Sequence, residues 1–377
     1  MTKYKVSLSK PDITEKEYKA VLEVLKTSHL SLGKKYLEFE KLMAKFAGVK
    51  YAVVVNSGTS GLHLIIRALG IKEGDEVITT PFSFIASSNC ILFERAKPIF
   101  VDIDEKTFNI DVKKIEEKIT KNTKAILAVD VFSQPADWQE LRKIAEKHKL
   151  FLIEDSAEAL GSEYMQKKCG SFGEAAVFAF YPNKQITTGE GGIILTNNKN
   201  IYEFCRSSAN QGRKALDGKW LEHIRLGYNY RLDELSCALG IAQIKRIKEI
   251  FKKRIRVANL YNKKLKNIEG LEIPYIKPGN KLSWFVYVIK LSEKFSGKKK
   301  DNIIKEMAKR GIQCGKYFQT IHLQPFYKKE FGYKEGSYPV AENISKRTLA
   351  LPFYNDLSEK EIDFVVNNLK EVIRLIK

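Results

Sequence analysis

Short apolar runs alternate with amphipathic stretches between residues 50 and 200. The spaces between several runs hold helical patterns, for example Leu62–Leu69, Ile85–Arg95 and Trp138–His148. Strands separated by helices of this length favour a largely parallel α/β sheet. The runs predict strands at Tyr51–Val55, Glu76–Thr80, Pro98–Ile103, Ala125–Phe132, Leu150–Ile153, Ala175–Phe180 and Gly192–Thr196.

The pattern changes after residue 230. Residues 233–266 predict one long helix, or two, without a proline to break it. Beyond it we expect a strand at Trp284–Leu291 and helices at Lys300–Arg310 and Glu359–Lys377. Ser358 and Glu361 have the spacing of a capping box at the start of the last helix. This change predicts a second, smaller α+β domain at the C-terminus.

Composition is typical of a globular protein, with 44% hydrophobic and 29% charged residues among 377. A chain of this size buries a core without disulfides or metal. No apolar run approaches the ~18 residues of a membrane span, and the N-terminus has no apolar signal region. The five cysteines are scattered and form no CxxC pair, which indicates a reducing compartment, and we expect the cytoplasm.

The formal net charge of +20 permits an anionic partner, either nucleic acid or a phosphorylated small molecule. The basic runs at Lys245–Arg256 and Lys298–Lys300 lack the interleaved aromatic residues of a single-strand binder. We find no helix-turn-helix with a basic recognition helix, zinc-finger spacing or RNP motif. The charge is therefore interpreted as lysines on solvated faces, and a DNA-binding regulator remains the rival hypothesis.

Ligands of open α/β sheets bind beyond the carboxyl ends of the strands. The first strand is followed there by the loop Asn56–Gly61, which opens onto a helix. Unpaired N–H groups and two glycines at such a helix start can cradle a phosphate. By itself the loop could equally be an ordinary Gly/Ser turn.

Three further features follow other strands. Phe84 lies in an aromatic loop, Asp155 follows a strand, and Lys184 lies in a loop closed by the glycine-rich segment Thr187–Gly192. Taken singly, Phe84 could simply pack in the core, Asp155 could cap the next helix, and Lys184 could be an ordinary solvated lysine. Together with the phosphate cradle they are what a phosphorylated pyridine aldehyde requires: a Schiff-base amine, an acid for the ring nitrogen, and a stacking ring.

Three segments, residues 57–59, 178–192 and 227–235, resemble the DegT/DnrJ/EryC1/StrS sugar aminotransferases. The resemblance covers essentially the whole chain. It implies pyridoxal 5'-phosphate (PLP) as cofactor and the aspartate-aminotransferase fold type I. We expect a large domain with a mainly parallel seven-stranded sheet at residues 1–250 and a small domain at 251–377. The first ~30 residues are candidates to pack with the small domain.

The resemblance also implies roles for residues around the cofactor ring. Lys184 matches the lysine that binds the cofactor aldehyde, and Asp155 matches the acid paired with the pyridinium nitrogen. Phe84 falls where the family stacks an aromatic ring. Glu158 falls beside the ring hydroxyl. Related sugar dehydratases carry histidine in place of the lysine, so Lys184 argues against dehydration.

At the phosphate, Thr59 and Ser60 match the family's loop positions. Asn229 matches an asparagine that reaches the phosphate from the neighbouring subunit, which implies a homodimer with shared active sites. One position departs from the pattern, because Ala179 stands five residues before the lysine, where the family often has a serine that donates to phosphate.

The activity implied is transfer of an amino group, from L-glutamate, to the ketone of a nucleotide-linked 4-keto-6-deoxy sugar. The nucleotide, the sugar and amination at carbon three instead of carbon four stay open. By family position alone, Ser31 in the 28–31 loop, Tyr317 and His322 are candidates for contact with the sugar. His322 is equally well interpreted as a packed histidine. Metal, nucleic acid and membrane are not expected partners.

Overall fold

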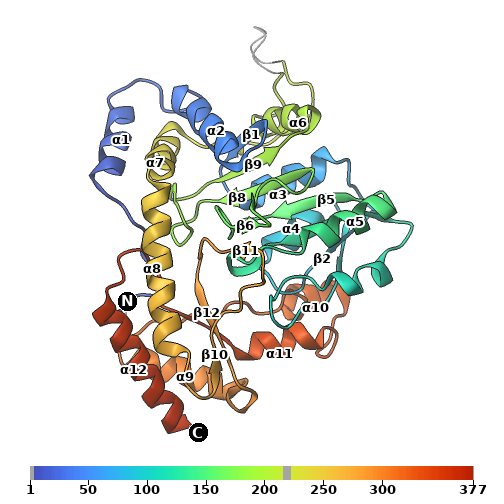
Figure 1. Ribbon diagram of the computed structural model, residues 1–377. Coiled ribbons are helices and arrows are strands. Elements are labelled where there is room, and N and C mark those ends of the chain that lie inside the picture. Colours follow the sequence, from blue (N-terminus) through green and yellow to red (C-terminus); the bar gives the residue numbers. More distant parts are fainter. Residues whose placement is uncertain (1–3, 215–221, 377) are drawn as a thin grey trace.

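The computed structural model describes residues 4–214 and 222–376 (Figure 1). Its centre is a seven-stranded sheet of order β1-β9-β8-β5-β4-β2-β3. These strands span Tyr51–Val55 (β1), Glu76–Thr79 (β2), Lys97–Phe100 (β3), Thr123–Val129 (β4), Phe151–Asp155 (β5), Ala175–Ala179 (β8) and Gly192–Thr196 (β9). Strands β3, β2, β4, β5 and β8 are parallel, whereas β9 is antiparallel to both β8 and β1. The predicted mainly parallel seven-stranded sheet is confirmed.

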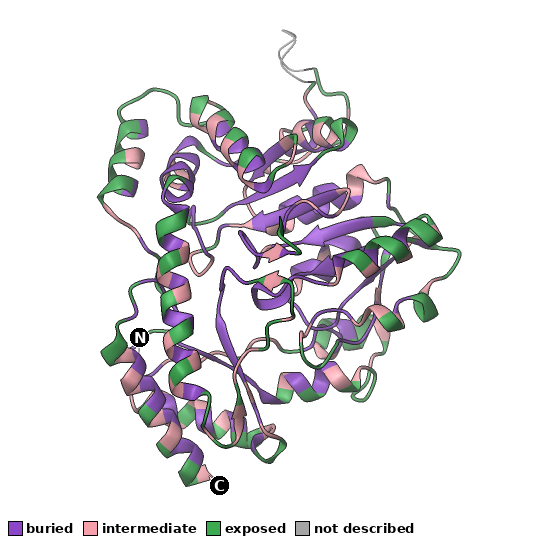
Figure 2. Cartoon of the chain, viewed as in Figure 1, coloured by how far each residue is buried: buried purple, intermediate pink, exposed green. Residues whose placement is uncertain are grey.

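Helices cover both faces of this sheet, and most residues of its strands are buried (Figure 2). On one face, Leu62 and Ile65 of α3 pack with Ile201 of α6. On the other face, Phe39 of α2 packs with Ile241 of α7. The helices around the sheet span Glu15–Leu25 (α1), Lys34–Ala47 (α2), Gly58–Ala68 (α3), Ala86–Leu92 (α4), Trp138–His148 (α5), Lys199–Ala209 (α6) and Glu234–Lys245 (α7).

The long helical region after residue 233 consists of two helices, α7 and α8 (Ile247–Leu265). They meet at Arg246, whose backbone leaves the helical region at φ −111° and ψ 20°. The guanidinium of Arg246 is buried and pairs with the carboxylates of Asp12 and Glu17. The N-terminal segment therefore holds the junction from which α8 runs down to the C-terminal part of the chain.

The C-terminal part has its own core around a three-stranded sheet of order β10-β12-β13. Val6 near the N-terminus belongs to this core and forms a bridge with Ile312. The division at residue 250 stays a prediction. The remaining elements span Glu163–Tyr164 (β6), Lys167–Lys168 (β7), Leu271–Glu272 (β10), Asn280–Lys281 (β11), Tyr287–Leu291 (β12), Lys298–Lys309 (α9), Pro325–Phe331 (α10), Pro339–Arg347 (α11), Thr348–Leu351 (β13) and Glu359–Ile376 (α12).

Local capping explains where the last helix begins. The N–H of Ser358 donates to Glu361 Oε2 over 2.8 Å, and the N–H of Glu361 donates back to Ser358 Oγ over 3.2 Å. The predicted capping box is confirmed. Within residues 4–214 and 222–376, no helix is long and apolar enough to cross a membrane.

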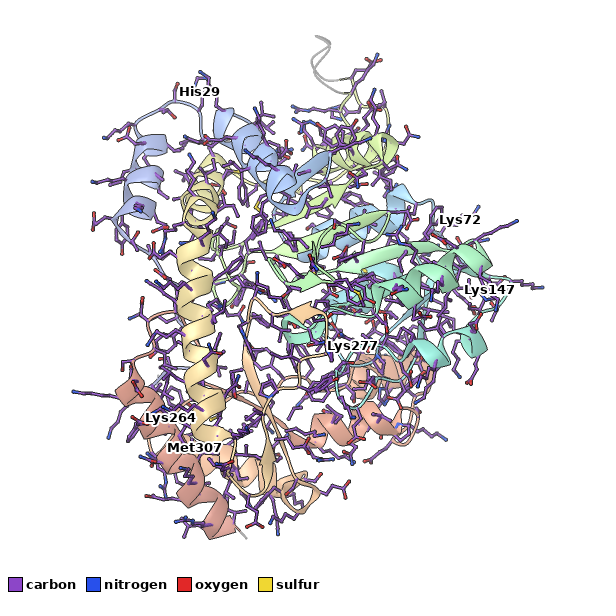
Figure 3. The ribbon with its side chains drawn as sticks, in the orientation of Figure 1. His29, Lys72, Lys147, Lys264, Lys277 and Met307 are labelled. Atoms are coloured by element: carbon purple, nitrogen blue, oxygen red, sulfur yellow. The ribbon has the colours of Figure 1, made fainter. Side chains whose placement is uncertain are left out.

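Basic side chains are spread over the molecule instead of forming one stripe. Lys72 and Lys147 lie at the right of the view in Figure 3, and Lys264 lies at the lower left. Several are paired with acids: Lys264 contacts Glu359 at 3.0 Å, and Lys147 contacts Glu116 at 2.8 Å. This distribution is typical of solvated faces.

Candidate active site

Lys184 lies in the loop after β8, where its side chain is buried. Its Nζ lies 3.6 Å from Glu158 Oε1 and 4.0 Å from the ring centroid of Phe285. Burial lowers the pKa of Lys184, and the negative charges of Glu158 and Asp155 oppose that shift. The ordinary alternative of a solvated lysine is excluded, because only a small part of this side chain reaches solvent.

Asp155 is the last residue of β5, and its carboxylate is buried. Ser87 Oγ donates to Asp155 Oδ2 over 2.7 Å, and the N–H of Ala157 donates to Oδ1 over 3.1 Å. The residues that follow are turns, so the alternative of a helix cap is wrong. Burial raises the pKa of Asp155, and the bond from Ser87 opposes that rise. A cationic ring nitrogen beside this carboxylate would favour its ionised form and lower its pKa.

Glu158 is held beside Lys184 by hydrogen bonds to its carboxylate and to its backbone oxygen. The N–H of Phe132 donates to Glu158 Oε2 over 3.0 Å, and Gln185 Nε2 donates to the backbone oxygen of Glu158 over 2.7 Å. Burial raises the pKa of Glu158, while the charge of Lys184 lowers it. The structure thus brings together three predicted residues, Lys184, Asp155 and Glu158.

The candidate phosphate loop forms the start of α3. Ser57 is the N-cap and accepts from the N–H of Ser60 over 3.0 Å, while Ser60 Oγ donates to Asn56 Oδ1 over 2.6 Å. Thr59 is half-buried in the first turn, where backbone N–H groups have no intrahelical partner. A Cβ on Gly192 would lie 2.6 Å from Gly58 N, so glycine is needed where β9 passes this turn.

Ala179 borders the same turn. A Cβ on Gly58 would lie only 2.9 Å from the Cβ of Ala179. Position 179 therefore faces the start of α3, and alanine offers no hydroxyl there. The departure from the family pattern falls at the phosphate end of the site.

Phe84 and Tyr317 lie at the margins of the cluster. Phe84 is 62% exposed, and its backbone oxygen lies 3.2 Å from Ser87 Oγ, the group that donates to Asp155. Asn183, the neighbour of Lys184, donates from Nδ2 to the hydroxyl of Tyr317 over 3.2 Å. Both candidates are thus tied to the residues around Lys184, and their roles remain predictions.

Three other candidates form no hydrogen bond or ion pair with Lys184 among the described residues. His322 is completely buried, with Nε2 3.0 Å from Glu342 Oε1, as expected for the packed histidine of the alternative interpretation. Ser31 is exposed and pairs with Asp233 in a β-bridge. Asn229 is exposed on the segment that leads to α7.

Sequence reasoning missed the residues that hold these groups in place. Ser87, Phe132 and Gln185 position Asp155 and Glu158 through tertiary hydrogen bonds. No local motif marks them. The only available signal was position, because Ser87 follows the aromatic loop and Gln185 is adjacent to Lys184.

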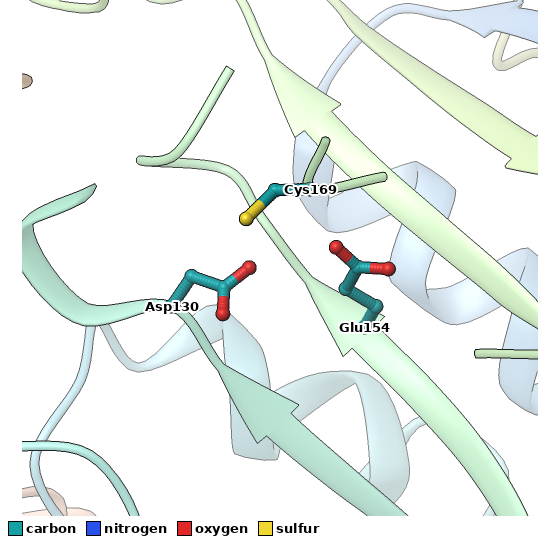
Figure 4. Close-up of side chains that lie close together, drawn as sticks. All are labelled: Asp130, Glu154 and Cys169. Atoms are coloured by element: carbon teal, nitrogen blue, oxygen red, sulfur yellow. The ribbon is translucent and has the colours of Figure 1, made fainter. Parts of the chain in front are cut away.

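Glu154, the residue before Asp155, belongs to a buried cluster of titratable side chains. Asp130, Glu154 and Cys169 place their ligand atoms within 4.8 Å of one another (Figure 4). Asp130 Oδ1 accepts from the N–H of Ala136 and from Trp138 Nε1. The N–H groups of Gly170 and Phe172 donate to Glu154. These donors occupy the oxygens that a cation would need.

Ser156 joins the two carboxyl groups. Its Oγ contacts both Asp130 Oδ2 and Glu154 Oε1, but a hydroxyl has one proton to donate. The second contact requires a carboxyl proton, so the pair holds one shared proton. Burial and the charge of Glu154 accordingly raise the pKa of Asp130 to about 8.

Asp130→Asn should preserve this network, because an amide N–H can donate to Ser156 while Ser156 donates to Glu154. We expect its free energy of unfolding at pH 6 to be at least that of wild type, because asparagine takes up no proton on folding whereas Asp130 does. Asp130→Ala should lose roughly 2–4 kcal/mol.

The pH dependence follows from the sign of the shift. An acid whose pKa is raised on folding contributes stability at low pH that is lost as pH rises through about 8. Asparagine does not titrate, so the variant should lose less stability than wild type between pH 5 and 9. Urea unfolding at several pH values measures this. Equal destabilisation by asparagine and alanine at pH 6 would contradict the shared proton.

The residues present fit a phosphorylated pyridine cofactor. A desolvated amine lies near two buried acids at the carboxyl edge of the sheet, beside a helix start with open N–H groups. Asn183 Oδ1, next to Lys184, is buried and has no hydrogen-bond partner among the described residues. Fold and site together define the class of PLP enzymes of fold type I.

Comparisons with known proteins agree. The DegT/DnrJ/EryC1/StrS aminotransferase family matches residues 11–370. GDP-perosamine synthase of Caulobacter vibrioides is 36% identical over 371 residues, covering 98% of this chain and 98% of that protein. Helicobacter pylori PseC, an aminotransferase of pseudoaminic acid biosynthesis, has a TM-score of 0.93 and 32% identity, covering 98% of this chain and 99% of its own. A Streptococcus pneumoniae protein assigned as a sugar aminotransferase and solved in its PLP form has a TM-score of 0.94 and 27% identity, covering 99% of this chain and 100% of its own.

The chain belongs to the DegT/DnrJ/EryC1/StrS aminotransferase family. It is a PLP-dependent sugar aminotransferase, and the resemblance described from the sequence is confirmed.

Proposed function

We propose that this enzyme transfers an amino group from L-glutamate to the ketone of a nucleotide-diphosphate 4-keto-6-deoxy sugar. The observation that carries the chemistry is the largely buried amine of Lys184 near the carboxylates of Asp155 and Glu158. The relatives that act in perosamine and pseudoaminic acid synthesis support a nucleotide-linked amino sugar as product. Amination at carbon three is the alternative.

PLP, when bound, supplies an aldehyde for the amine and a ring that withdraws electrons from the substrate carbon. Lys184 would hold its aldehyde carbon, and Asp155 would hold a proton at its ring nitrogen. Phe84 would stack on the ring and Glu158 would lie near its hydroxyl. Thr59, Ser60 and Asn229 would hold the phosphate.

Lys184 also serves as the proton carrier in this proposal. Its pKa is lowered by burial, so a larger fraction of the amine is neutral near pH 7 than in solution. A neutral amine can accept a proton from one of the two reacting carbons and, once protonated, donate it to the other. The charges of Asp155 and Glu158 keep the protonated form accessible, as a shuttle requires.

The substrate assignment is tested by a screen. Purified enzyme is offered UDP-, GDP-, dTDP- and CDP-linked 3-keto and 4-keto sugars with L-glutamate, and release of 2-oxoglutarate is measured. We expect release with one or a few 4-keto-6-deoxy sugars. Release only with 3-keto sugars would move the reaction to carbon three, and release with none of the panel would overturn the substrate class.

We further propose that the enzyme works in the cytoplasm as a homodimer with shared active sites. Exposed apolar side chains surround Asn229 and Ser31: Leu30, Leu32, Ile224 and Leu226 are between 47% and 69% exposed. Because Asn229 and Ser31 are both exposed, they are available to a second copy. A twofold dimer presents this surface on both subunits.

A mixed dimer tests the sharing. Lys184→Ala and Asn229→Ala are each assayed as homodimers at limiting PLP, then unfolded and refolded together. If Asn229 acts on the partner's site, one site of a mixed dimer contains both substitutions, while the other contains intact Lys184 and intact Asn229. We expect activity to return toward one working site per mixed dimer. If mixed dimers form and no activity returns, Asn229 serves its own subunit or no site.

The DNA-binding alternative makes a different prediction. Its main support is the net charge of +20, but the basic residues are dispersed and many are paired with acids. Purified enzyme should show an absorbance band beyond the protein range that borohydride removes. A colourless protein that binds DNA with steep salt dependence would support the regulator.

A further inference from the structure

A cluster of one buried and four half-buried side chains, which the proposed chemistry does not use, adjoins Asn229. We name it the tyrosine clamp: His63, Arg67, Glu94, Tyr228 and Tyr230. Tyr228 and Tyr230 flank Asn229 and stack on each other, with ring centroids 4.8 Å apart at 10°. Their hydroxyls contact α3, on which His63 and Arg67 lie. The clamp therefore connects the Asn229 segment to the helix that begins with the phosphate loop.

The hydrogen bonds of the clamp form one continuous chain that has a tyrosine at each end. His63 Nδ1 lies 3.2 Å from the hydroxyl of Tyr230, and His63 Nε2 lies 2.8 Å from Glu94 Oε1. Arg67 NH1 donates to both oxygens of Glu94, at 2.9 and 3.1 Å, and to the hydroxyl of Tyr228 at 3.1 Å. Each tyrosine hydroxyl thus has its own anchor on α3.

The clamp's charge balance fixes the form of the histidine. Arg67 already neutralises Glu94, and His63 is only 4% exposed. Burial lowers the pKa of His63, against the pull of Glu94. A neutral ring satisfies both contacts: Nε2–H donates to Glu94 and Nδ1 accepts from Tyr230. Every polar group of the clamp is then paired, which makes it rigid.

The backbone around Asn229 meets the phosphate loop at a second point. The N–H of Asn56 donates to the backbone oxygen of Tyr230 over 2.8 Å, and Asn56 Nδ2 donates to that of Asn229 over 3.4 Å. The other end of the Asn56 amide accepts from Ser60. Asn229 is therefore held between two anchors that both lead to α3, while its side chain remains exposed.

We propose that the tyrosine clamp is a positioning device that aims Asn229 at the cofactor phosphate of the partner subunit. This inference rests on the shared active site proposed above. In this arrangement α3 supports two active sites. The first turn of α3 would hold the phosphate of its own subunit. The residues further along α3 hold the segment of Asn229, which would reach the phosphate of the other subunit. Tyr228, Tyr230 and His63 are positioning residues, since they act through Asn229.

The test is a double-mutant cycle on PLP affinity. Tyr230→Phe keeps the stacked ring and removes only the hydroxyl on His63. Wild type, Tyr230→Phe, Asn229→Ala and the double variant are titrated with PLP, and the dissociation constant is read from cofactor absorbance. We expect Tyr230→Phe alone to weaken binding roughly two- to tenfold, the effect of one hydrogen bond. In the Asn229→Ala background it should have no further effect.

Tyr51→Phe is the matched control, because Tyr51 also belongs to a stacked tyrosine pair, with Tyr202, but lies at the far end of β1 from the phosphate loop. Its PLP affinity should equal that of wild type. Thermal midpoints of all variants separate lost positioning from lost stability. Additive effects of Tyr230→Phe and Asn229→Ala, or an unchanged Tyr230→Phe, would overturn the clamp. No effect of Asn229→Ala itself would instead refute the shared site, and the clamp with it.

Discussion

Lys184→Ala should abolish turnover while leaving the fold intact. The variant loses both the amine that holds the cofactor aldehyde and the group that moves the proton, so we expect a loss of at least about 10⁴-fold. PLP should still bind without a covalent link, because the phosphate loop and Asp155 are unchanged. Release of 2-oxoglutarate and cofactor absorbance measure the two effects separately.

Lys199→Ala is the control for this experiment. Lys199 is exposed at the start of α6, where it pairs with Glu203, and its loss should leave turnover unchanged. The circular dichroism spectra of both variants should match that of wild type. Repeated turnover by Lys184→Ala at a near-native rate would contradict the proposed role of Lys184 in catalysis.

Asp155→Asn should cost roughly 10³-fold or more in rate, equivalent to about 4 kcal/mol. The amide can still accept from Ala157 and contact Ser87, so the local turn survives. It cannot hold the proton at the ring nitrogen, and the ring then stabilises charge on the substrate carbon poorly. Binding of PLP should weaken far less than catalysis.

Single-turnover rates and PLP dissociation constants distinguish these effects. A rate loss below about tenfold, or ~1.4 kcal/mol, would mean that Asp155 only supports the turn through Ala157. Ser87→Ala offers an intermediate case, because it removes one donor from Asp155 and leaves the carboxylate. We expect the single-turnover rate of Ser87→Ala to fall less than that of Asp155→Asn.

The sequence predicted the sheet well because its strands are continuous buried runs. The bounds of β1, β9 and α5 agree with the prediction. The run Ala125–Phe132 was predicted too long: β4 ends at Val129, and Phe132 turns to a φ of 54° where its N–H meets Glu158. The predicted strand at Trp284–Leu291 begins only at Tyr287. The backbone oxygen of Trp284 is instead bound by Arg254.

The site was predictable to the extent that it follows strand ends. Asp155 and Lys184 were found because they follow β5 and β8, and the start of α3 because a glycine-rich loop precedes it. Residues that hold the site in place, such as Ser87, were not found, because their positions depend on contacts between segments distant in sequence. The clamp residue His63 and its partner Tyr230 are 167 positions apart, and no local pattern predicts such a pair.

The central claim is that Lys184 holds PLP, and peptide mapping after reduction tests it most directly. Borohydride converts the link between the lysine and the cofactor into a stable secondary amine, which mass spectrometry locates in a digest. We predict that the cofactor mass is found on the peptide that contains Lys184 and is absent from that peptide's Lys184→Ala counterpart. A cofactor adduct on another lysine, or no adduct in enzyme incubated with PLP, would contradict the account.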